Sequence, residues 1–309
     1  MAGKEGILSK ILAKNDTNQG LMNIVRAVHG LLESDDIEKV RSAQENMGSL
    51  LTARKNRRFR EEELNGIHGE WTLVDRPHEK KRIVLFCHGG GYSTGSCIYA
   101  RSVTTKLAEA LALDVLSFDY RLAPEFPYPA ACEDAMKVWN SLMLRGYGAD
   151  QIIVAGDSAG GNLALSLLLK LKSEQRMLPG ALILMSPWTD MTASGKSYEQ
   201  KADLDPVLDA DYMERMTVNY AQELDRNDPF LSPLFGDFTG FPPTYIQVGS
   251  NEILFSDSAM LFEKMQKAGV RSKIDIYEGM WHVFQMTSFK TAYEAVDDAA
   301  QFLYDTILK

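Results

Sequence analysis

Two short glycine-rich segments hold the residues best suited to chemistry, at positions 88–91 (HGGG) and 156–161 (GDSAGG). The second has the form G-x-S-x-G, with an apolar run before it and a helical pattern after it. A strand, a tight turn and a helix in this order lift one serine hydroxyl clear of a sheet. The glycines are needed because the backbone passes close to itself at that turn. The spacing therefore predicts a nucleophile, Ser158.

A serine hydroxyl needs an adjacent general base near neutral pH. Of the five histidines, only His282 follows Ser158, as the chain order nucleophile, acid, histidine requires. His282 lies in the loop 279–284, just after a predicted strand at 273–277, so it lies at the carboxyl edge of the sheet, as Ser158 does. We therefore predict that His282 is the base.

The third member should be a carboxylate that orients the imidazole. Glu252 lies in the loop 249–254, which follows a predicted strand at 244–248 and reaches the same sheet edge. Asp257 is the competing carboxylate, but it falls inside the next helix, where an acid in the first turn has an ordinary helix-dipole role. We predict Glu252 and keep Asp257 as the alternative.

Backbone N–H groups near the nucleophile can stabilise a developing oxyanion. The glycines at 88–91 follow a strand-like run at 82–87, and Ala159 stands directly after the nucleophile at a helix N-terminus. We predict an oxyanion hole formed by Gly89, Gly90, Gly91 and Ala159.

Strands alternate with helices along most of the chain, which predicts a mostly parallel sheet covered by helices on both faces. The predicted strands are 71–75, 82–87, 114–118, 151–155, 181–185, 244–248 and 273–277. The predicted helices are 99–111, 129–144, 162–169, 256–268 and 289–308. Residues 1–55 read as helical, and the polar stretch 186–242 reads as an insertion with one helix at 209–222.

The composition is that of an ordinary globular protein, with 45% hydrophobic and 24% charged residues among 309. A formal charge of −9 argues against a nucleic-acid partner. No apolar run is long enough for a membrane span, and charges interrupt the N-terminus too often for a signal peptide, so we expect a cytoplasmic protein. Cys87, Cys97 and Cys132 lack metal-ligand spacing, and we predict no metal site.

Several multi-residue segments resemble the bacterial hormone-sensitive lipase family (family IV) of the α/β-hydrolases. They are the two glycine motifs, with Tyr92 after the first, and the runs 119–130 (DYRLAPEFPYPA), 186–190 (SPWTD) and 228–234 (DPFLSPL). The resemblance implies an α/β-hydrolase fold and a cofactor-free carboxylesterase that prefers short acyl chains. It also implies a helical cap, made of 1–55 and 186–242, over a catalytic domain made of 56–185 and 243–309. The family more commonly has aspartate where this chain has Glu252.

The leading hypothesis is a serine carboxylesterase that hydrolyses a small-molecule ester through an acyl-enzyme. The alternatives are a ligand-binding receptor on a hydrolase scaffold, and a peptidase or amidase for small substrates. Tyr92 and Trp188 are candidate walls of the substrate pocket, although each equally suits core packing, and Met213 and Met216 are interpreted as buried packing. A homodimer stays an alternative to a monomer, because the last strand and final helix could form a dimer edge.

Overall fold

The computed structural model describes residues 20, 22–23, 25–27, 36–52, 58–78 and 81–308. An eight-stranded sheet forms the centre, with the strand order β1-β2-β4-β3-β5-β6-β7-β8. The strands are β1 (Arg58–Leu64), β2 (Ile67–Leu73), β3 (Ile83–Cys87), β4 (Asp114–Phe118), β5 (Ile152–Asp157), β6 (Ala181–Met185), β7 (Thr244–Gly249) and β8 (Ser272–Tyr277). Only the pairs β1–β2 and β2–β4 are antiparallel, and the remaining pairs are parallel.

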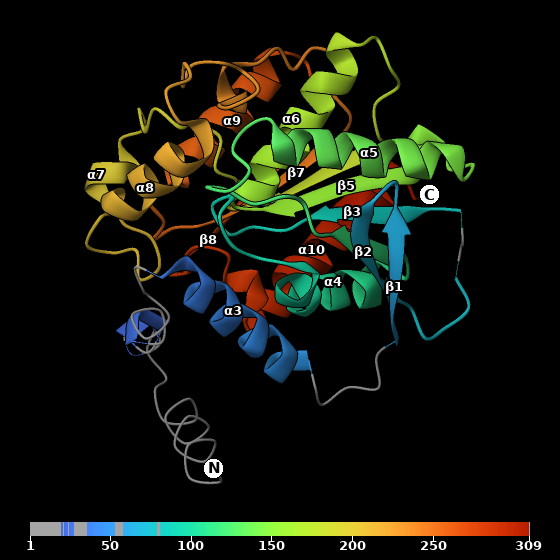
Figure 1. The fold of residues 1–309 in the computed structure, drawn as a ribbon, viewed down its shortest axis with the longest axis horizontal. Coiled ribbons are helices and arrows are strands. Elements are labelled where there is room, and N and C mark those ends of the chain that lie inside the picture. The colour runs from blue at the N-terminus through green and yellow to red at the C-terminus, as the bar shows by residue number, and fades with distance from the viewer. Residues whose placement is uncertain are drawn as a thin grey trace, which may run out of the picture.

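Helices cover both faces of this sheet (Figure 1). One face packs against α5 (Ala130–Leu144), α6 (Ala159–Ser173) and α9 (Phe255–Lys267), and the other against α4 (Cys97–Leu111) and α10 (Lys290–Thr306). Alternate residues of the central strands enter opposite cores: Leu85 packs on the α6 side and Phe86 on the α4 side. All five residues of β3 are buried, as expected for a parallel strand covered on both faces. The structure confirms the predicted α/β-hydrolase architecture.

The first two strands differ most from the sequence prediction. The strand predicted at 71–75 begins earlier, at Ile67, and ends at Leu73. The strand β1 was not predicted, because its sequence RFREEEL is mostly charged. It is an edge strand that pairs with β2 alone. Arg60, Glu61 and Glu63 are exposed there, and charged side chains on an edge strand discourage pairing with another chain.

The polar insertion 186–242 contains α7 (Ser197–Gln200), α8 (Ala210–Ala221) and a short 3₁₀ turn, η2 (Pro233–Phe235). Figure 1 shows α7 and α8 close together at one end of the sheet. Within the predicted cap segment 1–55, the structure describes the helix α3 (Ile37–Thr52) and a few residues before it. Residues 1–19 and 53–55, with others between 21 and 35, lie outside the described residues. The division into a cap and a catalytic domain stays a prediction.

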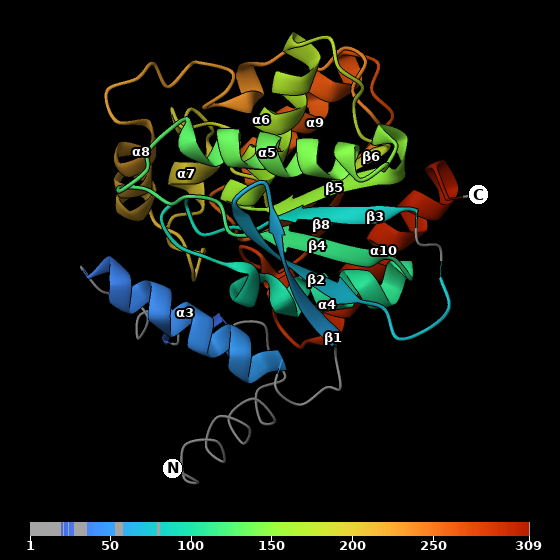
Figure 2. The same ribbon diagram turned by 45° about the vertical axis from the view of Figure 1, so that its right-hand side comes forward.

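Helix α3 packs along α4, as Figure 2 shows from a second side. The approach is close at Gly48, where a Cβ atom would stand 2.4 Å from the carbonyl oxygen of Ile98. In the part of the chain that the structure describes, no helix is long and apolar enough to cross a membrane. Strand β8 forms one edge of the sheet, and whether two copies associate there stays a prediction. Two further 3₁₀ turns, η1 (Ala149–Gln151) and η3 (Phe284–Met286), complete the described elements.

Candidate active site

Ser158 occupies the sharp turn between β5 and α6. Its backbone has φ 53° and ψ −121°, a conformation that non-glycine residues rarely adopt. A Cβ atom at Gly156 would stand 2.3 Å from the carbonyl oxygen of Gly160, and one at Gly160 would stand 2.0 Å from that of Cys87. Both glycines are therefore sterically required, because backbone atoms on both sides of the turn leave no room for a side chain. The turn presents the Ser158 hydroxyl beyond the carboxyl end of β5.

Three side chains predicted from the sequence meet at this edge of the sheet. The Nε2 atom of His282 lies 2.9 Å from Ser158 Oγ, and its Nδ1 atom lies 3.0 Å from Glu252 Oε2. Glu252 is fully buried, and His282 is 7% exposed. With Nδ1–H donating to the carboxylate, Nε2 is free to accept the serine proton. The arrangement is chemically able to generate a nucleophilic serine oxygen.

The buried carboxylate of Glu252 is held through both oxygens. While Oε2 faces His282, Oε1 accepts hydrogen bonds from the Gly249 N–H and from Ser186 Oγ, the latter at 2.7 Å. Asp205, in the insertion 186–242, accepts a hydrogen bond of 2.9 Å from the N–H of Ile253, which is the residue directly after Glu252. Burial raises the pKa of Asp205 to about 6.

Asp257, the alternative acid, has other partners. Its Oδ2 atom accepts hydrogen bonds from the N–H groups of Thr189, at 2.7 Å, and Asp190, at 3.0 Å. Burial raises the pKa of this carboxyl to about 8. The structure therefore ties Asp257 to the segment after β6 and places Glu252 against the imidazole.

The glycine loop 89–91 changes the predicted set of oxyanion donors. The N–H of Gly89 already donates to Asp157 Oδ1 at 2.9 Å, so it is not available to a substrate. Gly90 and Gly91 have φ values of +115° and +61°, and among the described residues none accepts a hydrogen bond from either N–H. Ala159 is the first residue of α6, where N–H groups have no acceptor within the helix. Gly90, Gly91 and Ala159 remain as candidate donors.

Asp157 is the buried residue that holds Gly89. Its Oδ2 atom has no hydrogen-bond partner among the described residues, and burial raises the pKa of the carboxyl to about 7. The loop that carries the candidate oxyanion donors is thus anchored to the residue directly before the nucleophile.

The two side chains predicted to bind substrate are packed against protein. Tyr92 is fully buried, its ring stacks on Tyr220 with centroids 3.6 Å apart, and its hydroxyl donates to Asn162 Oδ1 at 2.7 Å. Trp188 is also buried, and its backbone N–H donates to the carbonyl oxygen of Ser158 at 3.1 Å. The structure corrects the expectation for Tyr92, because Tyr220 covers its ring and Asn162 satisfies its hydroxyl. Substrate contact by Trp188 stays a prediction.

Sequence reasoning assigned no role to two residues that support the site. Asn162 stands directly after the GDSAGG motif, as a polar residue in the mostly apolar first half of the helix, and that signal was available. Its amide nitrogen donates to the carbonyl oxygens of Trp188 and Leu231, both at 2.9 Å. Asp205 gave no such signal, because only the folded chain brings it to the acid loop.

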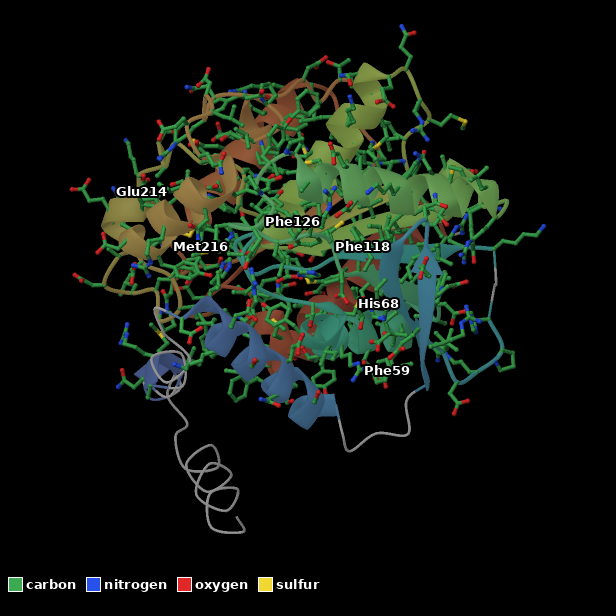
Figure 3. The ribbon with its side chains drawn as sticks, viewed as in Figure 1. Phe59, His68, Phe118, Phe126, Glu214 and Met216 are labelled. Carbon is green, nitrogen blue, oxygen red and sulfur yellow. The ribbon has the colours of Figure 1, made fainter. Side chains whose placement is uncertain are left out.

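Met216, interpreted as packing, lies at the glycine loop. A Cβ atom at Gly91 would stand 2.7 Å from Met216 Cγ, so this side chain of α8 covers a candidate oxyanion donor. Figure 3 shows Met216 on α8, together with Glu214.

One group among the described residues combines metal-ligating types, namely His68, Cys97 and Asp119, whose ligand atoms lie within 4.8 Å of one another. Its carboxylate is already engaged, since Oδ2 pairs with His68 Nδ1 at 2.6 Å and Oδ1 accepts the N–H of Cys97 at 2.7 Å. Burial also raises the pKa of the Cys97 thiol well above its ordinary value, which disfavours the thiolate that a metal needs. These contacts describe a hydrogen-bonded cluster within the fold.

Comparisons with known proteins point to one family. The family model described as "alpha/beta hydrolase fold" matches residues 84–286. An "Esterase" of Acinetobacter venetianus is 38% identical over 242 residues, which cover 77% of this chain and 79% of the relative. An "Acetyl-hydrolase" of Streptomyces hygroscopicus is 36% identical over 215 residues, covering 70% and 71% of the two chains. The crystal structure of "an esterase from the bacterial hormone-sensitive lipase (HSL) family" superposes with a TM-score of 0.90 at 30% identity, covering 95% of this chain and 99% of that one.

Proposed function

Since the chain belongs to the bacterial hormone-sensitive lipase family of α/β-hydrolases, we propose that it is a carboxylic ester hydrolase with Ser158 as its nucleophile. The observation that carries the proposal is the pair of contacts at His282, 2.9 Å from Ser158 Oγ and 3.0 Å from Glu252 Oε2. A hydroxyl, an imidazole and a buried carboxylate in series form the arrangement that makes serine nucleophilic.

In the proposed reaction, Ser158 attacks the ester carbonyl carbon while His282 accepts its proton. The N–H groups of Gly90, Gly91 and Ala159 stabilise the negative charge on the carbonyl oxygen. His282 then gives the proton to the leaving alcohol, which leaves the acyl group on Ser158. Water, deprotonated by His282, attacks this acyl-enzyme and releases the carboxylic acid, and the serine recovers its proton. Glu252 stabilises the imidazolium in both halves.

The substrate class we propose is small esters with short acyl chains. Met216 of α8 lies directly over Gly91, so the insertion limits the space beside the reacting carbonyl. We further propose that α3 and the insertion 186–242 together act as the cap over the site. No step of this mechanism requires a cofactor.

The proposal is tested by labelling with an organophosphate ester and by turnover of p-nitrophenyl butyrate. We expect one phosphoryl group per chain, on Ser158, and Ser158→Ala should lower kcat on the order of 10⁴-fold or more. Ser173→Ala, which alters a serine at the other end of α6, is the matched control and should keep full activity. Labelling at another residue, or a Ser158→Ala variant that turns over the ester at close to the wild-type rate, would contradict the proposal.

The same assay separates the alternatives. A receptor on this scaffold would bind the ester without turnover. A peptidase or amidase would cleave the corresponding p-nitroanilide at a rate comparable to the ester.

A further inference from the structure

We propose that Ser186 is a positioning residue for the reaction, which fixes Glu252 and the loop of His282 relative to each other; this inference rests on the proposed function. Ser186 directly follows β6 and is fully buried. Its backbone N–H donates to the carbonyl oxygen of Gln247 on β7 at 2.7 Å. The carbonyl oxygen of the preceding residue, Met185, accepts a hydrogen bond of 3.0 Å from the N–H of Ser158. Ser186 is therefore anchored to the two strands that lead to the nucleophile and the acid.

The Ser186 hydroxyl joins two other parts of the site. It donates a hydrogen bond of 2.7 Å to Glu252 Oε1 and accepts one of 3.2 Å from the N–H of Val283. Val283 directly follows His282 in the chain. Among the described side chains, no other forms hydrogen bonds with both Glu252 and the backbone of the histidine loop. The contacts thus form a closed ring. Glu252 binds His282, the next residue Val283 donates to Ser186 Oγ, and Ser186 Oγ donates to Glu252.

The two residues that meet at this hydroxyl are conformationally strained. Ser186 has φ +48° and Val283 has φ +50°, values in the left-handed region that disfavours side chains, and β-branched residues above all. Strained backbone persists only where the surrounding contacts hold it. The bond between Ser186 Oγ and the Val283 N–H is one such contact, and it fixes the direction in which the neighbouring imidazole leaves the backbone.

The length of the Glu252 side chain gives the Ser186 hydroxyl a second role. Glutamate has one more rotatable bond than the aspartate that is common in this family, so its carboxylate has more positions to choose from. Ser186 and the Gly249 N–H bind Oε1, which leaves Oε2 facing His282 Nδ1. The imidazole becomes charged only as the reaction proceeds. A misplaced Glu252 therefore reduces the stabilisation of the transition state and leaves ester binding unchanged.

The test compares Ser186→Ala with Ser258→Ala, using kcat and KM for p-nitrophenyl butyrate. Ser258 is a matched control, since it is also fully buried and its Oγ has no hydrogen-bond partner among the described residues. We expect Ser186→Ala to lower kcat about 10- to 100-fold with KM within about twofold, and Ser258→Ala to change neither. Ser186→Gly is a second variant that also deletes the hydroxyl, and glycine adopts φ +48° without strain, so folding is favoured.

A double-mutant cycle with Glu252→Asp adds an independent measurement. If Ser186 acts through Glu252, the combined variant should lose much less than the product of the two single losses. The proposal is overturned if Ser186→Gly keeps wild-type kcat, if the loss appears only in KM or thermal stability, or if the two losses multiply. Ser158→Ala separates the two levels of inference: turnover close to the wild-type rate in that variant refutes the proposed function, whereas full activity of Ser186→Gly alone refutes only the role of Ser186.

Discussion

Substitution of Asp257 tests whether its carboxyl group contributes to the stability of the fold or to catalysis. It is fully buried, and its pKa is raised to about 8 by that burial, although two backbone N–H groups donate to it. In the unfolded chain an aspartate has a pKa of about 4. Between these two values the folded state binds one proton that the unfolded state has released. The stability contribution of this group is therefore fully present below about pH 4 and is lost as the pH rises towards 8.

The magnitude follows from linkage. A difference of one bound proton lowers the free energy of unfolding by about 1.4 kcal/mol for each pH unit. Asp257→Asn removes the titration while keeping an oxygen that can accept the N–H groups of Thr189 and Asp190. Relative to the wild type, the variant should gain about 3 kcal/mol of stability between pH 5 and pH 7. Urea unfolding followed by tryptophan fluorescence at pH 5, 6, 7 and 8 measures this difference.

The same variant also tests which carboxylate serves His282. Asp257→Asn should keep kcat within about threefold of the wild type, whereas Glu252→Gln should lower it on the order of 10³-fold or more. A stability difference that stays constant from pH 5 to 8 would refute the argument for a buried, protonated Asp257. A large loss of kcat in Asp257→Asn together with an active Glu252→Gln would refute the assignment of the acid.

Two further predictions concern contacts that hold the site in place. Gly160→Ala should destabilise the protein by about 3 kcal/mol or more in urea unfolding, because the new methyl would stand 2.0 Å from the Cys87 carbonyl oxygen. Gly240→Ala, at an open position with φ +80°, should cost only about 1 kcal/mol, and equal costs would contradict the steric argument. Arg41→Ala should lower stability by about 1–3 kcal/mol, because Arg41 donates to the carbonyl oxygens of Ser93 at 2.9 Å and Ala123 at 3.0 Å. Limited proteolysis should then cut α3 faster in Arg41→Ala than in the control Lys39→Ala. Lys39 is a suitable control because it pairs with Asp36, which is exposed. Equal cleavage of the two variants would exclude the anchoring role of Arg41.

The central strands and the nucleophile turn could be predicted from the sequence because local signals were strong there. The run Ala181–Met185 is continuously apolar and fully buried, and such a short apolar run is typical of a strand covered on both faces. The turn at Ser158 was predictable because steric exclusion at Gly156 and Gly160 has a direct signature in residue type. The charged edge strand Arg58–Leu64 had no such signature, since only its pairing with β2 makes it a strand.

The contacts around the site could not be predicted in the same way. Gly89 was expected to donate to the oxyanion, but its N–H is taken by Asp157, 68 residues further along the chain. Tyr92 has the residue type of a pocket wall, yet Tyr220, from α8, covers its ring. Both outcomes depend on long-range packing that no local spacing encodes. The residue types showed which groups could react, and the tertiary contacts decided which of them are available.

The contacts of α3 and α8 with the glycine loop bear on how the predicted cap works. Met216 of α8 packs on Gly91, Tyr220 of α8 stacks on Tyr92, and Arg41 of α3 donates to the Ser93 carbonyl oxygen. All three contacts fall on residues 91–93, at or within three residues of the candidate donors Gly90 and Gly91. A displacement of either helix would therefore disturb the backbone that must hold these donors in place before the reaction begins. If the predicted cap holds these donors in place, changes in α3 and α8 should lower kcat as well as alter the substrate range.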